Sequence, residues 1–337
     1  MLKQMQIENF TVFAKADFEF APGLNVIIGE NGTGKSHVLK LAYATIQQAN
    51  DIVSNKSSAS GKLNRVFGSV TADQLCRFRA ESSTGYFQAH LKFDQNNGQI
   101  YITHKKSESD GILLGPNTST KDYKYAKAVF FPTRELLSIY PGFVSLYEAR
   151  YLEFEETYRD TCLLLGEPLL KKPMTDLMVI LEEAMGGKVE LDHGRFYLVT
   201  PEQGKLEMPL VAEGLRKLAM LAQLIAVGAL VKGGYLFWDE PEANLNPRLT
   251  KVIAGVILQL AKAGIQIFIA THSLFLLREL EVLQAAEKKP VPQRYFALKQ
   301  GLDGVEVEQG NAVDDLQTLI LLEEELMQSD RYMDVGQ

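Results

Sequence analysis

Residues 23–50 read GLNVIIGENGTGKSHVLKLAYATIQQAN, and this stretch decides the fold. The apolar run from Leu24 to Ile28 predicts a buried strand, and a periodic apolar pattern predicts a helix over residues 35–50. Between them, residues 29–36 fit the pattern G-x-x-x-x-G-K-[ST]. A strand, a glycine-rich turn and a helix in this order predict a phosphate-binding loop. In such a loop, the backbone N–H groups and the helix N-terminus face an anion.

Each residue type in this phosphate loop (residues 29–36) has an expected role. The glycines allow the backbone to turn its N–H groups toward a phosphate chain. Lys35 is expected to reach the β- and γ-phosphates, and Ser36 to hold Mg²⁺, so ATP and Mg²⁺ are the expected cofactors. The residues expected to contact the nucleotide are Gly29, Asn31, Gly32, Thr33, Gly34, Lys35, Ser36 and His37.

An acidic pair directly follows a second apolar run. Residues 235–238 predict a strand that is covered on both faces, and Asp239 and Glu240 come next. Ligands of open α/β sheets bind beyond the carboxyl ends of the strands, so the pair is expected beside the phosphate loop. We expect Asp239 to bind Mg²⁺ through water beside Ser36, and Glu240 to be the general base for the attacking water.

A third apolar run, GIQIFIATHS at residues 264–273, predicts a strand that ends at His272. A histidine at a strand end is usually structural. Here the neighbouring acidic pair favours a contact of His272 with the γ-phosphate or the attacking water. Strands that alternate with helices predict an α/β core with a parallel sheet.

The rest of the sequence predicts smaller elements around this core. Residues 1–20 predict two strands that join the strand at 24–28 in one sheet, and residues 62–105 predict short strands that include a hairpin. Phe13 or Lys15 is expected against the adenine, with core packing as the alternative for Phe13. The expected divisions of the single domain are an N-terminal lobe with a β-subdomain at 1–133, a helical insert at 134–187, the region of the acidic pair and His272 at 188–289, and a C-terminal hairpin and helix at 290–337.

Composition narrows the class of protein. The 337 residues are 46% hydrophobic and 23% charged, as in an ordinary globular protein. The net charge of −7 divides into +4 over residues 1–135 (16 basic, 12 acidic) and −11 over residues 136–337 (19 basic, 30 acidic). This excludes a strongly basic nucleic-acid coat protein but leaves open a local basic face on the first lobe. We see no spanning apolar run and no signal peptide, so we expect a cytoplasmic protein without a membrane partner.

The order of these motifs resembles one group of proteins. The phosphate loop, helical insert, apolar helix, DE pair, N-L-x-P loop and T-H-S resemble the ATP-binding-cassette (ABC) ATPases of the SMC, Rad50 and RecF type. Closer still are the small AAA-type ATPases related to the overcoming-lysogenization-defect nucleases and the ATPases of bacterial anti-phage systems. The resemblance implies an ABC-type ATPase head, with a mixed or parallel sheet core, an N-terminal antiparallel β lobe and a helical insert.

The resemblance also implies a homodimer with composite ATP sites. Residues 211–217, VAEGLRK, occupy the position of the signature segment, which in the family reaches the nucleotide of the partner subunit. Glu213 and Gly214 are therefore expected to contact ATP across the dimer. Ala212 and Glu213 replace the usual serine and glycine, and Arg216 or Lys217 is expected to supply the positive contact that is missing.

A further departure concerns the loop after Phe131. Residues 132–135, PTRE, lack the glutamine that family members place there, and Arg134 or Glu135 is the candidate for a related coupling role.

The implied function is an ATPase that hydrolyses ATP and couples its nucleotide state to an effector nuclease or toxin. We expect the effector to be a separate chain encoded nearby, and a role in bacterial anti-phage defence. One alternative is a RecF-like, DNA-binding ATPase in repair, for which nucleic acid is the partner. Another is a scaffold that binds ATP without hydrolysing it.

Overall fold

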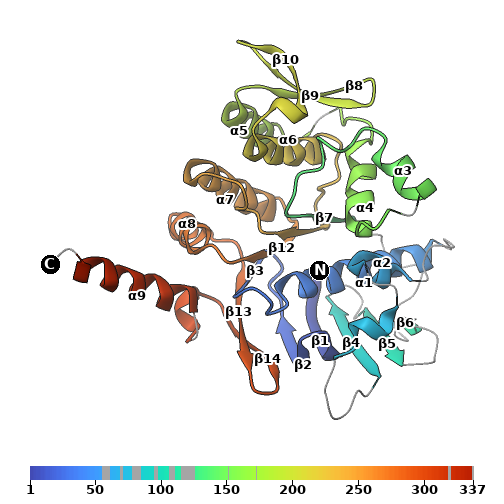
Figure 1. The fold of residues 1–337 in the computed structure, drawn as a ribbon, viewed down its shortest axis with the longest axis vertical. Helices are drawn as coiled ribbons and strands as arrows, with labels where there is room; N and C mark the ends of the chain where they lie inside the picture. The colour runs from blue at the N-terminus through green and yellow to red at the C-terminus, as the bar shows by residue number, and fades with distance from the viewer. Residues whose placement is uncertain are drawn as a thin grey trace.

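The centre of the molecule is a six-stranded sheet (Figure 1). The computed structural model describes residues 1–54, 61–68, 71–77, 85–94, 98–105, 111–114, 126–150, 152–171, 173–317 and 320–335. In these residues, the sheet order is β14-β13-β3-β12-β11-β7. The strands are β3 (Leu24–Gly29), β7 (Ala128–Phe131), β11 (Tyr235–Asp239), β12 (Gln266–Thr271), β13 (Gln293–Gly301) and β14 (Gly304–Gly310).

The register of this sheet brings the predicted site residues to one edge. β12 pairs in parallel with both β3 and β11, so Thr271 lies opposite Ile28, and Asp239 lies opposite Ala270. The sequence LNVIIG of β3 is buried on both faces as far as Ile28, as its continuous apolar run predicts. The α/β core with parallel strands is therefore confirmed, and antiparallel β14 makes the sheet mixed.

A second sheet has the order β2-β1-β4-β5-β6. Its strands are β1 (Leu2–Phe10), β2 (Phe13–Glu19), β4 (Tyr86–Phe93), β5 (Gln99–Lys105) and β6 (Gly111–Leu114). The expectation that β3 joins β1 and β2 in one sheet is wrong. In β1 and β2, buried residues alternate with more exposed ones, so these strands cover a core with one face only, whereas β3 is covered on both faces. The predicted hairpin is present as β4 and β5.

The helix that follows the phosphate loop lies between the two sheets. Helix α1 (Lys35–Val53) buries Val38, Leu41 and Ile46 in the same core as β1, β4 and the inner face of the six-stranded sheet. On the opposite side of that sheet lie α6 (Glu213–Ala226), α7 (Pro247–Lys262) and α8 (Leu274–Ala285) (Figure 1). α1 and the loop before it are therefore fixed by packing on both sides.

Several predicted elements differ in the structure. The insert holds three helices, α3 (Phe143–Arg150), α4 (Glu156–Leu165) and α5 (Thr175–Met185), and a three-stranded sheet follows it, with β8 (Lys188–Asp192), β9 (Arg195–Thr200) and β10 (Gly204–Glu207). Strands were expected from residue 62 onward, but α2 (Lys62–Phe67) and a 3₁₀ turn (Ala72–Leu75) occupy the start of that stretch. The final helix, expected within residues 290–337, is α9 (Ile320–Val335), which extends away from the molecule (Figure 1). The sequence also predicts polar loops over residues 51–61 and 106–122. In the structure α1 extends to Val53 and β6 occupies residues 111–114, and most of the other residues of both stretches lie outside the described residues.

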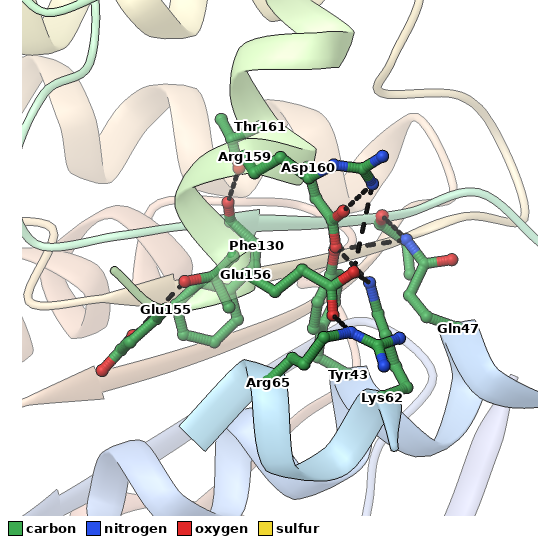
Figure 2. A network of polar contacts seen from close by, with 12 residues as sticks. Tyr43, Gln47, Lys62, Arg65, Phe130, Glu155, Glu156, Arg159, Asp160 and Thr161 are labelled. Carbon is green, nitrogen blue, oxygen red and sulfur yellow. Dashed lines mark hydrogen bonds and ion pairs between the residues drawn. The ribbon is translucent and has the colours of Figure 1, made fainter. Parts of the chain in front are cut away.

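The unexpected helix α2 is explained by a buried ionic network with α4 (Figure 2). Lys62 contacts the carboxylates of Asp160 and Glu156, and Arg65 Nε lies 2.8 Å from Glu156 Oε2. The Tyr43 hydroxyl of α1 donates to Asp160 Oδ2 at 2.7 Å. These contacts need helical spacing, because Lys62 and Arg65 must project from the same face. They tie the insert to the helix that carries the phosphate loop.

Among the described residues, no helix combines the length and the apolar character that crossing a bilayer requires.

Candidate nucleotide site

The phosphate loop connects β3 to α1 in a compact turn. The Thr33 hydroxyl donates to the carbonyl of Glu30 at 2.8 Å, which closes the turn before the helix begins. Gly34 has a φ of +87°, and a Cβ atom there would lie 2.6 Å from a methyl group of Val12. The close approach and the left-handed backbone both require glycine at this position. Asn31 and Gly32 are exposed at the tip of the loop.

The Lys35 side chain is folded back over the loop. Its ammonium group donates to the carbonyls of Gly29 at 2.7 Å and Glu30 at 2.8 Å. Burial lowers the pKa of Lys35, and the nearby carboxylates of Glu240 and Asp239 oppose this shift. Lys35 is thus a buried cation at the mouth of a turn rich in N–H groups, held by bonds that a phosphate oxygen can replace.

Ser36 and Asp239 meet across the edge of the sheet. Ser36 Oγ donates to Asp239 Oδ1 at 3.0 Å, although the two residues are 203 positions apart. Burial raises the pKa of Asp239, while the hydrogen bond from Ser36 and the charge of Lys40 act against it. Mg²⁺ prefers oxygen ligands and retains several waters, so a hydroxyl and a carboxylate at this distance fit a magnesium site.

Glu240 and His272 also lie together. Glu240 Oε1 is 3.3 Å from His272 Nδ1, and both side chains are partly exposed to solvent. Glu240 has a φ of +48°, which is uncommon for a residue with a side chain. Its backbone N–H donates to the carbonyl of Ala270, which holds this conformation. The structure therefore brings together the two residues to which sequence analysis assigned chemistry.

The basic residues of α6 have partners in the same chain. Lys217 is 2% exposed, and its Nζ donates to the carbonyls of Glu240 at 2.8 Å and Ala243 at 3.1 Å. Arg216 Nε lies 2.8 Å from Glu135 Oε1. In the single chain, Lys217 is buried away from the surface that a second chain would meet, and Arg216 is paired with Glu135, so a contact across a dimer stays a prediction. The Arg216–Glu135 pair joins α6 to the PTRE loop, where sequence analysis placed a coupling role.

The start of α6 faces a loop of its own chain. Glu213 Oε1 accepts a hydrogen bond from Asn244 Nδ2 at 2.9 Å, at an exposed position. A Cβ atom on Gly214 would lie 2.9 Å from the Asn244 carbonyl and 3.2 Å from Leu245, so glycine permits the close approach of loop and helix. The Asn244 contact connects the carboxylate of Glu213 to the loop of its own chain.

Three further residues had expected roles near the nucleotide. His37 follows Ser36 on α1, and its buried Nδ1 has no hydrogen-bond partner within the described part of the chain, while burial lowers its pKa. Phe13 is fully buried in the core, so the core-packing alternative holds for it. Lys15 lies on the open face of the second sheet, in a pocket with His90 and Tyr101, and not at the phosphate loop.

Two family models match the chain. A model described as "AAA domain, putative AbiEii toxin, Type IV TA system" matches residues 114–278, and one described as "AAA domain" matches residues 4–137. Together they include the phosphate loop, the acidic pair and His272.

Two relatives have repair functions in their names. The DNA replication and repair protein RecF of Streptococcus uberis is 33% identical over 82 residues, which are 21% of this chain and 22% of RecF. The DNA double-strand break repair Rad50 ATPase of Archaeoglobus fulgidus is 30% identical over 115 residues, 34% of this chain and 11% of Rad50. The matched segments therefore cover about a fifth of RecF and about a tenth of Rad50.

Solved structures of SMC heads share the fold. The SMC head domain from Thermotoga maritima has a TM-score of 0.55 at 14% identity, with 91% of this chain and 98% of that one covered. An SMC head bound to the C-terminal winged-helix domain of ScpA has a TM-score of 0.61 at 13% identity, covering 94% and 99%. The family models, the two relatives, the shared fold and the motif order together support an ABC-type ATPase of the SMC/Rad50/RecF type.

Proposed function

We propose that this protein binds ATP with Mg²⁺ and hydrolyses it. The observation that carries the proposal is the convergence of two pairs at one sheet edge. Ser36 Oγ lies 3.0 Å from Asp239 Oδ1, and Glu240 lies 3.3 Å from His272. A metal-binding pair, a carboxylate base and a histidine beside a phosphate loop are the parts that phosphoryl transfer to water requires.

Each side chain has a defined task in this reaction. Lys35 exchanges its two loop carbonyls for oxygens of the β- and γ-phosphates. Ser36 and Asp239 hold the magnesium ion, which when bound offsets the charge of the phosphates. Glu240 orients the attacking water and accepts its proton, and His272 contacts the γ-phosphate.

We further propose that two copies of the chain complete each site. Residues 213 and 214 begin α6, whose N-terminal N–H groups can bind a phosphate, and they lie beside exposed Asn244. The likeness to the SMC/Rad50/RecF type supports a second copy as the partner for this surface. The domain divisions at residues 133, 187 and 289 remain part of the proposal, with the insert joined to α1 through its ionic network.

The Glu240→Gln variant tests hydrolysis. It should keep its ATP affinity and lose phosphate release by at least about 100-fold, because the amide cannot accept the proton of water. Glu183→Gln, at an exposed position of α5, is the matched control and should release phosphate at the wild-type rate. Hydrolysis at the wild-type rate in Glu240→Gln would refute the assignment and favour a scaffold that only binds ATP.

Two outputs of the ATPase have support. The AbiEii-type family model supports coupling to an effector nuclease or toxin in anti-phage defence, and this is the output we propose. The likeness to RecF supports the alternative, binding to DNA in repair. ATP-dependent binding to duplex DNA that weakens steeply with salt would favour the alternative. Co-purification of a nuclease or toxin encoded beside this gene, without such DNA binding, would favour the effector.

A further inference from the structure

We infer that Glu242 is a positioning residue that holds His272 against Glu240. The inference rests on the proposed ATPase activity and adds a residue to its machinery. The sequence alone leaves two alternatives for Glu242, a residue of the loop at the proposed dimer seam or an ordinary surface acid.

The first observation is the contact between Glu242 and the segment that carries the histidine. Glu242 Oε1 accepts a hydrogen bond from Thr271 Oγ1 at 2.6 Å and lies 3.4 Å from the backbone nitrogen of His272, which also donates to it. Thr271 is 1% exposed and is the last residue of β12. One carboxylate oxygen therefore binds both the residue before His272 and the backbone of His272 itself.

The Thr271 hydroxyl also holds the residue that follows His272. Its oxygen accepts a hydrogen bond from the backbone nitrogen of Ser273 at 2.9 Å. The Ser273 side chain in turn caps α8, since Ser273 Oγ accepts from the nitrogen of Leu276 at 3.2 Å. His272 thus lies in a turn that is fixed at both sides, and Glu242 connects the backbone of this turn to the loop that follows the acidic strand end.

The second observation is that the turn of Glu242 is itself fixed. Lys217 donates to the carbonyls of Glu240 and Ala243, and the nitrogen of Ala243 donates to the Glu240 carbonyl at 3.1 Å. Residues 240–243 therefore form a rigid turn with Glu240 at its start and Glu242 within it. The same turn presents the proposed base and holds the histidine that contacts it.

The third observation is the other oxygen of Glu242. Glu242 Oε2 is buried and has no hydrogen-bond partner among the described residues. A buried carboxylate oxygen without a partner costs stability. The negative charge of Glu242 acts on the buried cations Lys35 and Lys217 and favours a higher pKa for each of them. Glu242 is therefore close enough to Lys35 for the two charges to interact, as expected for a residue of the nucleotide site.

Threonine and glutamate variants separate positioning from simple stability. Thr271→Val removes the hydroxyl that Glu242 binds, and Glu242→Leu removes the acceptor. Each should lower kcat by about 10- to 100-fold with the Kd for ATP unchanged, because a reacting group is displaced while the phosphate loop stays intact. Thr271→Ser and Glu242→Gln keep a donor and an acceptor, and each should recover most of the kcat that its apolar counterpart loses.

The double variant Glu242→Leu/Thr271→Val makes the test specific to this pair. Its kcat should fall no further than that of the more damaged single variant, because both changes break the same contact. A multiplied loss, a wild-type kcat in Thr271→Val, or a loss of ATP affinity equal to the loss of kcat would each overturn the inference. If Glu242→Leu fails to fold, Thr271→Val and Thr271→Ser still decide the question.

The same assays keep the two proposals apart. One outcome is that Glu240→Gln loses turnover while Thr271→Val keeps the wild-type rate. This would refute the role of Glu242 but would not contradict the ATPase proposal. A wild-type protein that releases no phosphate would overturn both.

Discussion

The two halves of the proposed ATP site are built in different ways. In one half, Lys35, Ser36, Asp239 and His272 all lie at the carboxyl ends of parallel strands, and each has a partner within the chain. In the other half, Glu213 lies exposed at the start of α6, beside a loop of the same chain. The first half is assembled by the sheet alone. In the proposed dimer, the second half contacts the nucleotide only when another chain binds to this surface.

Helix α6 contributes residues to both halves of the site within about one turn. Glu213 is exposed, whereas Lys217, one turn later, is 2% exposed and bonded to two carbonyls of the acidic turn. Lys217 therefore braces the catalytic half and adds no charge to the exposed end. The comparison teaches that a substitution in the first half can change ATP binding, turnover or stability, according to which side chain is removed. A substitution at the exposed end should change turnover alone.

The largest expected effect on stability is in the ionic network that ties the insert to α1. Lys62→Met leaves the carboxylates of Asp160 and Glu156 buried without their shared cation, which should cost about 3 kcal/mol of unfolding free energy. Lys205→Met is the matched control, because Lys205 also bridges two acids but at the surface. Chemical denaturation should show a clear loss for Lys62→Met and almost none for Lys205→Met. Equal losses of unfolding free energy in the two variants would show that burial of the network does not increase its contribution to stability.

The next largest effect concerns the phosphate loop. Lys35→Ala removes the cation expected at the β- and γ-phosphates and should weaken Mg-ATP binding by about 100-fold. Isothermal titration calorimetry measures this directly. Lys288→Ala, at an exposed position after α8, should bind ATP like the wild type. Unchanged affinity in Lys35→Ala would place the nucleotide elsewhere.

At the exposed end of α6, the expected effect is smaller and of another kind. Gly214→Ala places a methyl group 2.9 Å from the Asn244 carbonyl, so the loop must shift. Turnover should fall by about tenfold, as for a modest misplacement, with ATP affinity unchanged. Gly255→Ala is the matched control, because a Cβ atom there meets no neighbouring atom. A weakened ATP affinity in Gly214→Ala would contradict the division into two halves.

The effect that is smallest over a single pH unit is a pH dependence of stability at Lys217. Burial lowers its pKa to about 8, from 10.5. Between these values the unfolded chain binds more protons than the folded one, so raising the pH stabilises the fold, by at most about 1.4 kcal/mol per pH unit. Below pH 8 both states are protonated and the effect ends. The stability of the wild type relative to Lys217→Met should therefore rise from pH 8 to 10.5, and a flat or falling difference would contradict this.

The sequence predicted where the phosphate loop and Asp239 lie in the fold, because those signals are local. Glycine spacing marks the phosphate loop, and a continuous apolar run places Asp239 at a strand end without knowledge of any neighbour. The division of strands between two sheets was missed, because alternation along β1 does not say which strand it meets. The position of Lys217 had a readable signal, since it lies three residues after Gly214 and four before Leu221 on the buried face of α6.

The contacts of Glu242 had no such signal. Its partner Thr271 lies 29 residues away on another strand end, and only the parallel pairing of β11 with β12 brings the two together. The ionic partners of Lys62 are likewise more than 90 residues away, on the insert. Pairings of this kind depend on the tertiary fold, which the local pattern does not specify.

Mixing two inactive variants tests the composite site most directly. Lys35→Ala lacks a working phosphate loop, and Gly214→Trp lacks a working helix start, so neither should release phosphate alone. In a mixed dimer, the loop of the second variant meets the helix start of the first, and one complete site forms. We predict that phosphate release by the mixture rises well above the sum of the separate proteins. Release equal to that sum would contradict a site shared between two chains.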